Sequence, residues 1–452
     1  MASTTTTTSP VPSTTPAPSA VTHSGATVAP PATSTSVPAT CAAAKLAARS
    51  LAALGSAVKD AALEAIATAL LDRTPEILEA NATDLASGRE HGLSEALLDR
   101  LALDGGRVAA MAAGVRKIAT LSDPVGEVIE GSRLPNGLEV RKLRVPIGVI
   151  AVVYEARPNV TIDAAALCLK SGNAIVLRGS SMAAHSNSVL ASAAIEAGRS
   201  AGLPEGAIAL VAGGGHDELA QLATQAGVVD LIIPRGGEGL KAALKSVATV
   251  PVMYAASGNC HVYVDATADL DDALAIVLNA KTQRPSTCNA AETLLVHSAV
   301  AAELLPRALA SLARAGVELR GDQRTRALAG ETRVESATEE DWATEYHALT
   351  LAVRVLDSTE EAIDHINRYS SGHSDAILTR DTGSARAFGL GVDSACVYIN
   401  ASTRFTDGGE FGMGAEIGNS TQKLHARGPI GLRELCTFKY LVEGTGHTRP
   451  AG

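Results

Sequence analysis

The stretch from Gly148 to Asp265 constrains the fold most, because short apolar runs alternate there with helical segments. The runs are GVIAVVYE, AIVLR, AIALVAG, VDLIIPRG and VPVMYAA. Each is continuously apolar rather than alternating in polarity, which indicates strands covered on both faces. Helical segments start at Thr161, span His185 to Ala201, follow His216 and surround Leu240. The stretch therefore predicts an α/β fold with a mostly parallel, doubly wound sheet of the nucleotide-binding kind.

Glycines and small polar residues follow four of these predicted strands. The four strand ends are Glu155 to Asn159, Arg178 to Ser181, Gly213 to His216 and Pro234 to Gly237. Carboxyl ends of parallel strands share one edge of a sheet, which is where such folds bind ligands. Glycine lets a backbone approach a phosphate, and a helix that follows offers free N–H donors. One such turn is routine and usually carries no ligand, but four at one edge predict a cofactor site.

The part of the chain before this sheet is predicted to be helical and then to form a hairpin. From Cys41 to about Leu121, apolar residues recur every three or four positions. Between Val128 and Ile147, Pro135-Asn136-Gly137 separates two alternating runs, which is a strong hairpin signal. An isolated hairpin is marginal in water, so it packs on something else. We expect an arm that packs on another subunit, with a hairpin lying on its own domain as the alternative.

The first 40 residues contain no Lys, Arg, Asp or Glu and consist almost wholly of Ser, Thr, Pro, Ala and Val. Such a composition cannot bury enough surface to offset the entropy of ordering, so it predicts a disordered tail. A secretory signal would need a basic start and an unbroken apolar stretch, whereas the first basic residue here is Lys45. No apolar run in the sequence approaches membrane-spanning length.

Charge and cysteine spacing limit the class of partner. The formal net charge is −10, which argues against binding a phosphate backbone. The six cysteines are scattered, and none has the short paired spacing of a zinc site or a redox dithiol. We therefore expect a cytoplasmic protein that acts on a small molecule, with no metal site and with no nucleic-acid or membrane partner.

Three long stretches carry a resemblance to a known family. They are PIGVIAVVYEARPNVT, QRPSTCNAAETLLVH and FGMGAEIGNSTQKLHARGP, and they resemble the signature stretches of the gamma-glutamyl phosphate reductases, which have the aldehyde dehydrogenase fold. The resemblance runs from about residue 41 to 446. It implies an NADP-binding domain (41–128 and 149–263), a catalytic domain (264–427) and an oligomerisation β-arm (129–148 and 428–446) after the 1–40 tail. The predicted hairpin would be part of that arm.

Cys288 is the candidate nucleophile. Taken alone, any cysteine is most often a small core residue. Cys288, however, follows Pro285-Ser286-Thr287, which we interpret as a helix start whose N–H groups and dipole stabilise a thiolate. Its resemblance to the family's catalytic cysteine selects it, and implies that the Asn159 side chain and the Cys288 N–H stabilise the oxyanion. Without the resemblance, an Asx turn after Pro158 explains Asn159 equally well.

The reaction follows from the resemblance and from a missing carboxylate. Hydrolytic aldehyde dehydrogenases carry a water-activating Glu in Glu-Leu-Gly-Gly, whereas this sequence has Ala255-Ala256-Ser257-Gly258. Without that base a thioester survives until hydride arrives. The resemblance thus implies NADPH-dependent reduction of L-glutamyl 5-phosphate to L-glutamate 5-semialdehyde in proline biosynthesis, with release of phosphate through a Cys288 thioester.

Two other functions are alternatives to this one. One is another acylating or oxidising NAD(P)-dependent aldehyde dehydrogenase of the same fold. The other is a non-catalytic binding or scaffold member, which would have a disrupted Cys288 environment or lack Asn159. Neither disruption is seen in the sequence.

The cofactor residues are predicted from the strand ends and from the resemblance. Arg178-Gly179-Ser180-Ser181 stands where NAD-preferring relatives often have Lys-Pro-Ser-Glu, whose Glu binds the ribose 2′-hydroxyl. Ser181 removes that carboxylate, and a 2′-phosphate can pair with Arg178 and the serines, so NADP is favoured. We expect Gly213 and Gly236 in phosphate-binding turns. Glu345 matches the family position at the nicotinamide ribose, with a solvated glutamate before a strand as the alternative.

The substrate carries an amino group, a carboxylate and a phosphate, so its pocket needs charges of both signs. Candidates in the family-like stretches are Arg284, Arg404, Glu416, Lys423 and Arg427, with Arg404 the preferred anion binder. Lys and Arg are more often surface residues than ligands. His261 and His373 are candidate proton donors or substrate contacts, or else structural. We expect a homo-oligomer, and an upstream glutamate kinase is a candidate partner that would deliver the substrate.

Overall fold

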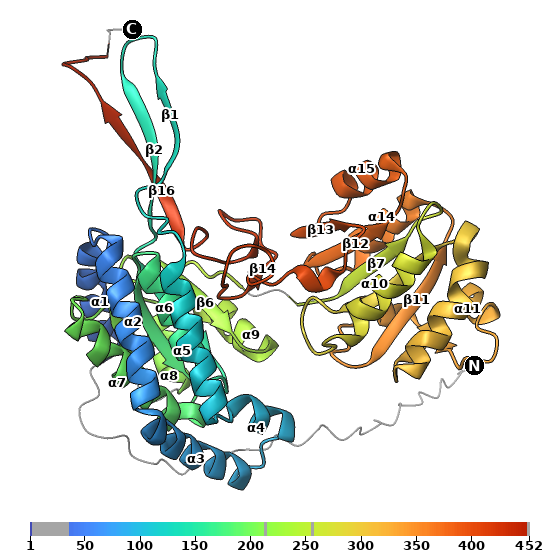
Figure 1. Ribbon diagram of the computed structural model, residues 1–452, viewed down its shortest axis with the longest axis horizontal. Helices are drawn as coiled ribbons and strands as arrows, with labels where there is room; N and C mark the ends of the chain where they lie inside the picture. The colour runs from blue at the N-terminus through green and yellow to red at the C-terminus, as the bar shows by residue number, and fades with distance from the viewer. Residues whose placement is uncertain (2–35, 212–214, 255–256, 450–452) are drawn as a thin grey trace. The chain divides into compact units, whose positions relative to one another are not determined.

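The computed structural model describes Met1 and residues 36–211, 215–254 and 257–449 (Figure 1). Three sequence features lie wholly or partly outside these residues: most of the predicted 1–40 tail, the glycine turn at Gly213, and Ala255-Ala256 of the stretch that lacks the base. Within the described part of the chain, no helix is both long enough and apolar enough to cross a bilayer.

The predicted parallel sheet is present, with strand order β5-β4-β3-β6 and parallel pairing throughout. Its strands are β3 (Val149–Tyr154), β4 (Ala174–Gly179), β5 (Ile208–Leu210) and β6 (Leu231–Arg235). Every residue of β3 and β4 is buried, as the continuously apolar runs predict. Tyr154 pairs with both Gly179 and Arg235, so the carboxyl ends of β4, β3 and β6 lie side by side.

Of the run predicted as the fifth strand, from Val250 to Ala256, the described residues 250–254 do not form a strand. A single parallel bridge joins Ile232 to Val252. In that bridge Ile232 N donates to Pro251 O, and Met253 N donates to Ile232 O. Pro251 has no N–H to donate, so the ladder cannot extend through it.

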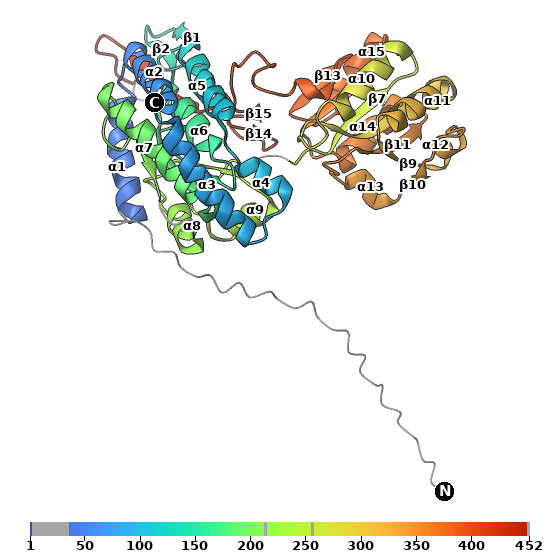
Figure 2. The same ribbon diagram turned by 60° about the horizontal axis from the view of Figure 1, so that its bottom comes forward.

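Helices cover this sheet. They are α1 (Val37–Leu51), α2 (Ser56–Asp72), α3 (Thr74–Glu90), α4 (Glu95–Leu101), α5 (Gly105–Thr120), α6 (Asn159–Lys170), α7 (Ala184–Ser200), α8 (His216–Ala223) and α9 (Glu238–Val247), with the 3₁₀ turn η1 (Ser181–Ala183). Helix α1 packs on β4 and against α8, while α6 and α7 pack on the sheet and carry α2 and α5 outside them (Figures 1 and 2). Helix α1 begins at Val37, inside the region predicted as a tail, with Pro38 in its first turn.

The predicted hairpin is present as β1 (Val128–Arg133) and β2 (Glu139–Pro146), with Gly137 at a positive φ of 94° in the turn. A third strand, β16 (Cys436–Glu443), pairs antiparallel with β2 along its whole length. Every residue of β1 is exposed, and so is β16 from Thr437 onward. Figure 1 shows the three strands as an arm that extends away from the first sheet. The hairpin therefore does not lie on its own domain, which excludes the alternative interpretation of it.

A second, larger parallel sheet has the order β10-β9-β11-β8-β7-β12-β13. Its strands are β7 (Cys260–Val264), β8 (Ala291–His297), β9 (Glu318–Gly321), β10 (Glu335–Ser336), β11 (Thr350–Leu356), β12 (Ser374–Leu378) and β13 (Cys396–Ile399). Its helices are α10 (Leu270–Thr282), α11 (Ser298–Arg314), α12 (Gln323–Ala327), α13 (Glu339–Ala343), α14 (Thr359–Tyr369) and α15 (Thr382–Gly391), with the 3₁₀ turn η2 (Thr403–Phe405). Strand β7 pairs with β8 and β12, so the boundary predicted after residue 263 falls before Cys260.

The chain then returns to the first sheet. Strands β14 (Asn419–Ser420) and β15 (Gly428–Pro429) form a small antiparallel pair. Around them Ile417, Ile430 and Leu435 are buried in the same apolar core as β3 and β4. Residues 417 to 427, the returning segment, therefore pack with the first sheet, although the sequence placed them in the catalytic domain.

Candidate active site

The amino ends of β7 and β8 meet around Cys288. Gly258 precedes β7, and a Cβ built on it would lie 1.9 Å from the carbonyl oxygen of Cys288. Because a clash with backbone cannot be relieved by turning a side chain, glycine is required at this position. From β7 itself, Cys260 Sγ lies 3.2 Å from the same oxygen. The turn that carries Cys288 is thus fixed from the side of β7.

The helix start predicted at Cys288 is wrong. Cys288 lies in a turn, and the chain continues into β8 at Ala291. Asn289 Nδ2 donates to the carbonyl oxygens of Arg404 and Thr406, and Thr403 Oγ1 donates to Asn289 O. Contacts with the η2 segment therefore hold the turn. Pro, Ser and Thr begin helices often, but here the apolar run after them is a buried strand.

Charged residues surround the Cys288 thiol. Of the six cysteines, all of which the structure describes, five are buried and Cys288 is half-buried. Burial raises the pKa of Cys288, the negative charge of Glu416 raises it further, and the positive charge of Arg235 lowers it. Arg157 and Arg404 also interact electrostatically with Cys288. Arg235 thus counteracts burial only in part, and the pKa of Cys288 stays above the ordinary value of a thiol.

Asn159 is the first residue of α6, directly after the N-cap Pro158, and among the described residues its side-chain oxygen accepts no hydrogen bond that would close an Asx turn. Its Nδ2 donates to Asp163 Oδ2 at 2.9 Å, one helical turn further on. Burial raises the pKa of the Asp163 carboxyl. An amide nitrogen carries two N–H donors, so Asn159 can serve Asp163 and one further acceptor.

Glu345 lies in the loop before β11 and is not a solvated residue. Its side chain is 17% exposed. Its Oε1 accepts a hydrogen bond from Gly258 N at 2.6 Å. Its Oε2 lies 3.3 Å from His347 Nε2, and this contact raises the pKa of His347. Glu345 therefore binds the backbone segment that packs against Cys288.

The start of α9 already binds an anionic group. Gly237 N donates to Glu155 Oε2 at 2.9 Å, and a Cβ on Gly236 would lie 2.7 Å from the Glu155 carboxylate. At the neighbouring strand end, Ser180 Oγ accepts from Ala156 N at 3.4 Å, and Ser181 begins η1. Backbone donors directed at a carboxylate are also suited to a phosphate. The predicted residues Ser180 and Gly236 therefore share one edge, which fits a phosphate-bearing cofactor.

Arg178, the residue before the last of β4, is buried. Its Nη2 donates to Gly215 O at 2.6 Å, at the start of α8. Burial lowers its pKa, and the nearby carboxylates of Glu218 and Glu155 act in the opposite direction. The guanidinium of Arg178 thus lies at the predicted cofactor edge, among acidic neighbours that the sequence did not reveal.

The predicted substrate residues are divided by the structure into two groups. Burial raises the pKa of Glu416 to about 7, and Gly408 N donates to its carboxylate at 3.1 Å. Arg404 Nε donates to Gln283 Oε1 at 2.9 Å. Arg284 is exposed and acts electrostatically on Arg404. Glu416 and Arg404 are therefore charge neighbours of Cys288, and Arg284 lies next to Arg404.

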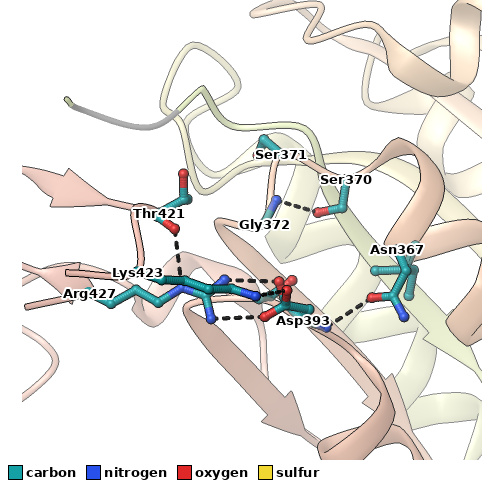
Figure 3. A pocket seen from close by; sticks show the side chains of 10 residues that line it. Asn367, Ser370, Ser371, Gly372, Asp393, Thr421, Lys423 and Arg427 are labelled. Atoms are coloured by element: carbon teal, nitrogen blue, oxygen red, sulfur yellow. Dashed lines mark hydrogen bonds and ion pairs between the residues drawn. The ribbon is translucent and has the colours of Figure 1, made fainter.

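Lys423 and Arg427 form the second group, because both pair with Asp393 after α15 (Figure 3). Arg427 Nη2 also donates to the carbonyl oxygen of Asp393. These residues line a cavity of about 490 Å³ together with Gly372 and Thr421, and Cys288 is not part of its lining. The two cations lower the pKa of Asp393 and connect the second sheet to the returning segment.

His261 and His373 are both completely buried at the β7 and β12 strands. His261 Nδ1 lies 3.1 Å from Asp375 Oδ1, and His373 Nδ1 lies 2.8 Å from Ser374 Oγ. Burial lowers the pKa of His373 to about 4. Their surroundings fit the structural interpretation of both.

Three residues near Cys288 were missing from the predicted site: Arg157, Arg235 and Gly258. Arg157 follows β3 and Arg235 is the last residue of β6, so their positions at strand ends were a usable signal. Gly258 is the last residue of Ala255-Ala256-Ser257-Gly258, the stretch that lacks the base. The sequence could not show that these three positions converge on one sulfur.

Comparisons with known proteins agree with this arrangement. The model of the aldehyde dehydrogenase family matches residues 6–339. The gamma-glutamyl phosphate reductase of Thermobifida fusca is 57% identical over 403 residues, covering 89% of this chain and 96% of that protein. The gamma-glutamyl phosphate reductase of Kineococcus radiotolerans is 55% identical, covering 91% of this chain and 96% of that protein.

Solved structures give the same result. The crystal structure of gamma-glutamyl phosphate reductase from Thermotoga maritima superposes with a TM-score of 0.89 at 45% identity, covering 92% of this chain and all of that one. An acetylating aldehyde dehydrogenase from Geobacillus thermoglucosidasius, 18% identical, covers 92% of this chain and 98% of its own with a TM-score of 0.64, and so shares the fold. The chain therefore belongs to the aldehyde dehydrogenase family and, within it, to the gamma-glutamyl phosphate reductases.

Proposed function

We propose that this chain reduces L-glutamyl 5-phosphate to L-glutamate 5-semialdehyde with NADPH, releasing phosphate, as a step of proline biosynthesis. Membership of the aldehyde dehydrogenase family makes it an oxidoreductase that uses a nicotinamide cofactor. The substrate assignment is supported by relatives that are 55–57% identical over most of the chain. The observation that carries the proposal is a half-buried Cys288 held against Gly258, with basic side chains around its sulfur.

In the proposed reaction Cys288 Sγ attacks the acyl carbon of the substrate. The bond from that carbon to the phosphate oxygen breaks, phosphate leaves with the electron pair, and a thioester remains on Cys288. Arg157, Arg235 and Arg404 favour the thiolate and the departing phosphate through their charge. The Cys288 N–H and Asn159 Nδ2 would stabilise the oxygen on which negative charge collects.

NADPH, when bound, supplies the hydride that reduces the thioester carbon. The carbon–sulfur bond then breaks, so that the aldehyde leaves and the Cys288 thiolate returns. We assign the backbone around Gly236 and Ser180 to the cofactor phosphates, and Glu345 to the nicotinamide ribose. Arg178 and Ser181 would hold a 2′-phosphate, which is the basis for preferring NADPH over NADH.

The proposal is tested by running the reaction in reverse. Purified protein with glutamate 5-semialdehyde, phosphate and NADP should form NADPH, and omission of phosphate should abolish the reaction. The Cys288→Ala variant should be inactive, and mass spectrometry should find an acyl adduct on Cys288 in the unaltered protein. NADP reduction without phosphate would indicate an oxidising aldehyde dehydrogenase instead, and a requirement for a thiol acyl carrier would indicate an acylating one.

We further propose that the chain assembles with copies of itself through the arm formed by β1, β2 and β16. Strand β16 is an open edge and exposes Phe438, Tyr440 and Val442 on one side. An exposed apolar edge strand is a template for pairing with another chain.

We place the enzyme in the cytoplasm, where its six unpaired cysteines remain reduced. We also expect a glutamate kinase, acting one step earlier, to supply the acyl phosphate.

A further inference from the structure

We propose that the buried ion pair between Lys281 and Glu292 is a positioning device that, through the turn at His347, holds Glu345 and Gly258 against Cys288. The inference rests on the proposed function, because it assigns two further residues to the cofactor and nucleophile site. Neither residue contacts Cys288 directly through its charged group, so both act through the loop before β11.

The pair itself is completely buried. Lys281 lies at the end of α10 and Glu292 in β8, and both are 0% exposed. Lys281 Nζ and Glu292 Oε2 lie 2.5 Å apart. Burying two charges costs solvation that their attraction repays poorly, so such a pair is weak evidence for stability as its purpose. A role in fixing the position of neighbouring groups explains it better.

The loop before β11 closes over this pair. Glu292 Oε1, the oxygen that does not face Lys281, accepts a hydrogen bond from His347 N at 3.3 Å. The ring of Tyr346 lies over Lys281 Nζ, 5.9 Å from its centroid. His347 has a φ of 54°, in the left-handed region that L side chains rarely adopt. A conformation of this kind persists where the surroundings fix it, and Glu292 bonds the backbone at that residue.

The same turn places Glu345 next to the residues that hold Cys288. His347 Nε2 faces Glu345 Oε2, while Glu345 Oε1 accepts from Gly258 N. Gly258 in turn packs on the backbone of Cys288. A continuous series of contacts thus runs from Lys281 to the nucleophile, through Glu292, His347, Glu345 and Gly258.

Two double variants separate positioning from mere stability. Lys281→Met with Glu292→Gln removes both charges but keeps a carbonyl oxygen that accepts from His347 N. Lys281→Met with Glu292→Leu removes both charges and the acceptor. Neither leaves a charge buried without its partner, so both are expected to fold, which thermal unfolding checks. Lys59→Met, which breaks the buried pair of Lys59 in α2 with Asp123, is the control for general loss of stability.

The readout is the rate at which iodoacetamide alkylates Cys288, followed by mass spectrometry. Besides burial and Glu416, the negative charge of Glu345 opposes ionisation of this thiol. Lys281→Met with Glu292→Leu (the Met/Leu variant) no longer holds the turn at His347 N, so Glu345 can move away from Cys288. We therefore expect alkylation to be at least about threefold faster in this variant than in the unaltered protein. Lys281→Met with Glu292→Gln (the Met/Gln variant) and Lys59→Met should be alkylated at nearly the rate of the unaltered protein. In a Glu345→Gln background the difference between the two double variants should vanish, because Glu345 transmits it.

NADPH affinity, measured by fluorescence titration, should fall about tenfold in the Met/Leu variant and little in the Met/Gln variant. Equal alkylation rates in the two double variants, or a difference that persists with Glu345→Gln, would overturn the inference. If instead the unaltered protein fails to bind NADPH or to show phosphate-dependent activity, the proposed function fails. The alkylation comparison then still decides whether Lys281 and Glu292 position the turn.

Discussion

At the scale of single residues, the reactivity of Cys288 depends on opposing charges that the fold brings together. Burial and Glu416 raise the pKa of its thiol, whereas Arg235 lowers it. Glu416 itself has a pKa of about 7, because burial disfavours its ionised form. The influence of Glu416 on the sulfur is therefore small below about pH 7 and grows as its carboxyl ionises above it.

We predict that Glu416→Gln lowers the pKa of Cys288 and Arg235→Met raises it. At about pH 8, iodoacetamide should therefore modify Cys288 several-fold faster in Glu416→Gln and several-fold slower in Arg235→Met. At about pH 6, where Glu416 is largely protonated in the unaltered protein, the Glu416→Gln effect should nearly disappear. Mass spectrometry of the modified peptide measures both rates, because the other five cysteines are buried.

Glu410→Gln is the matched control, since Glu410 is an exposed glutamate in the same loop as Glu416, between η2 and β14. It should leave the rate unchanged at both pH values. An equal acceleration by Glu410→Gln, or a Glu416→Gln effect that does not depend on pH, would show that the charge of Glu416 does not act on this sulfur.

At the scale of elements, the site is built where the amino ends of β7 and β8 approach each other. Adjacent parallel strands bring the residues before them close together, and Gly258 is close enough to touch the backbone of Cys288. This contact involves main-chain atoms on both sides, so it cannot be relaxed by moving a side chain. The position of the Cys288 nucleophile is thus determined by strands β7 and β8 as much as by its own turn.

Gly258→Ala should therefore displace Cys288. We expect kcat to fall by at least about 100-fold, because misplacing a reacting atom by about 1 Å costs that much. Thermal unfolding should also occur at a lower temperature. Gly239→Ala is the control: nothing lies within 4 Å of a Cβ at that position in α9, and alanine favours a helix. Near-normal turnover by Gly258→Ala would mean that the close approach is not needed.

At the scale of the whole molecule, the arm and the returning segment connect parts that are far apart in the sequence. Strand β16 pairs with β2, almost 300 positions earlier in the chain, and the segment before it is buried in the first core. The arm exposes apolar side chains; Tyr440, for example, is 59% exposed. Such a surface is costly to leave in water, which supports its use between copies of the chain.

We predict that Tyr440→Asp lowers the oligomeric state. A charge placed in a buried interface would lack a partner and weaken association. Sedimentation or light scattering of the purified protein should report a smaller mass than that of the unaltered protein. Leu390→Asp, which alters an exposed leucine of α15, a helix that packs on α14 and β13, should leave the mass unchanged. An unchanged mass for Tyr440→Asp would indicate that the arm is not the interface.

The sequence by itself determined the parallel first sheet, the hairpin and, through resemblance, the candidate nucleophile. These features are encoded locally: continuously apolar runs make buried strands, and Pro-Asn-Gly makes a turn. Local sequence patterns also gave two wrong predictions. Pro, Ser and Thr before Cys288 indicated a helix where pairing with β7 and β11 makes a strand, and Pro251 blocked the fifth strand.

Only the tertiary structure decided which charges and backbone atoms reach Cys288. Arg157, Arg235 and Gly258 come from separate strand ends, and Glu345 reaches the site through a left-handed turn fixed by Glu292. The physical reason is that electrostatic energy and steric contact depend on distance in space. Residues tens of positions apart acquire that distance only when the two sheets and their loops have packed.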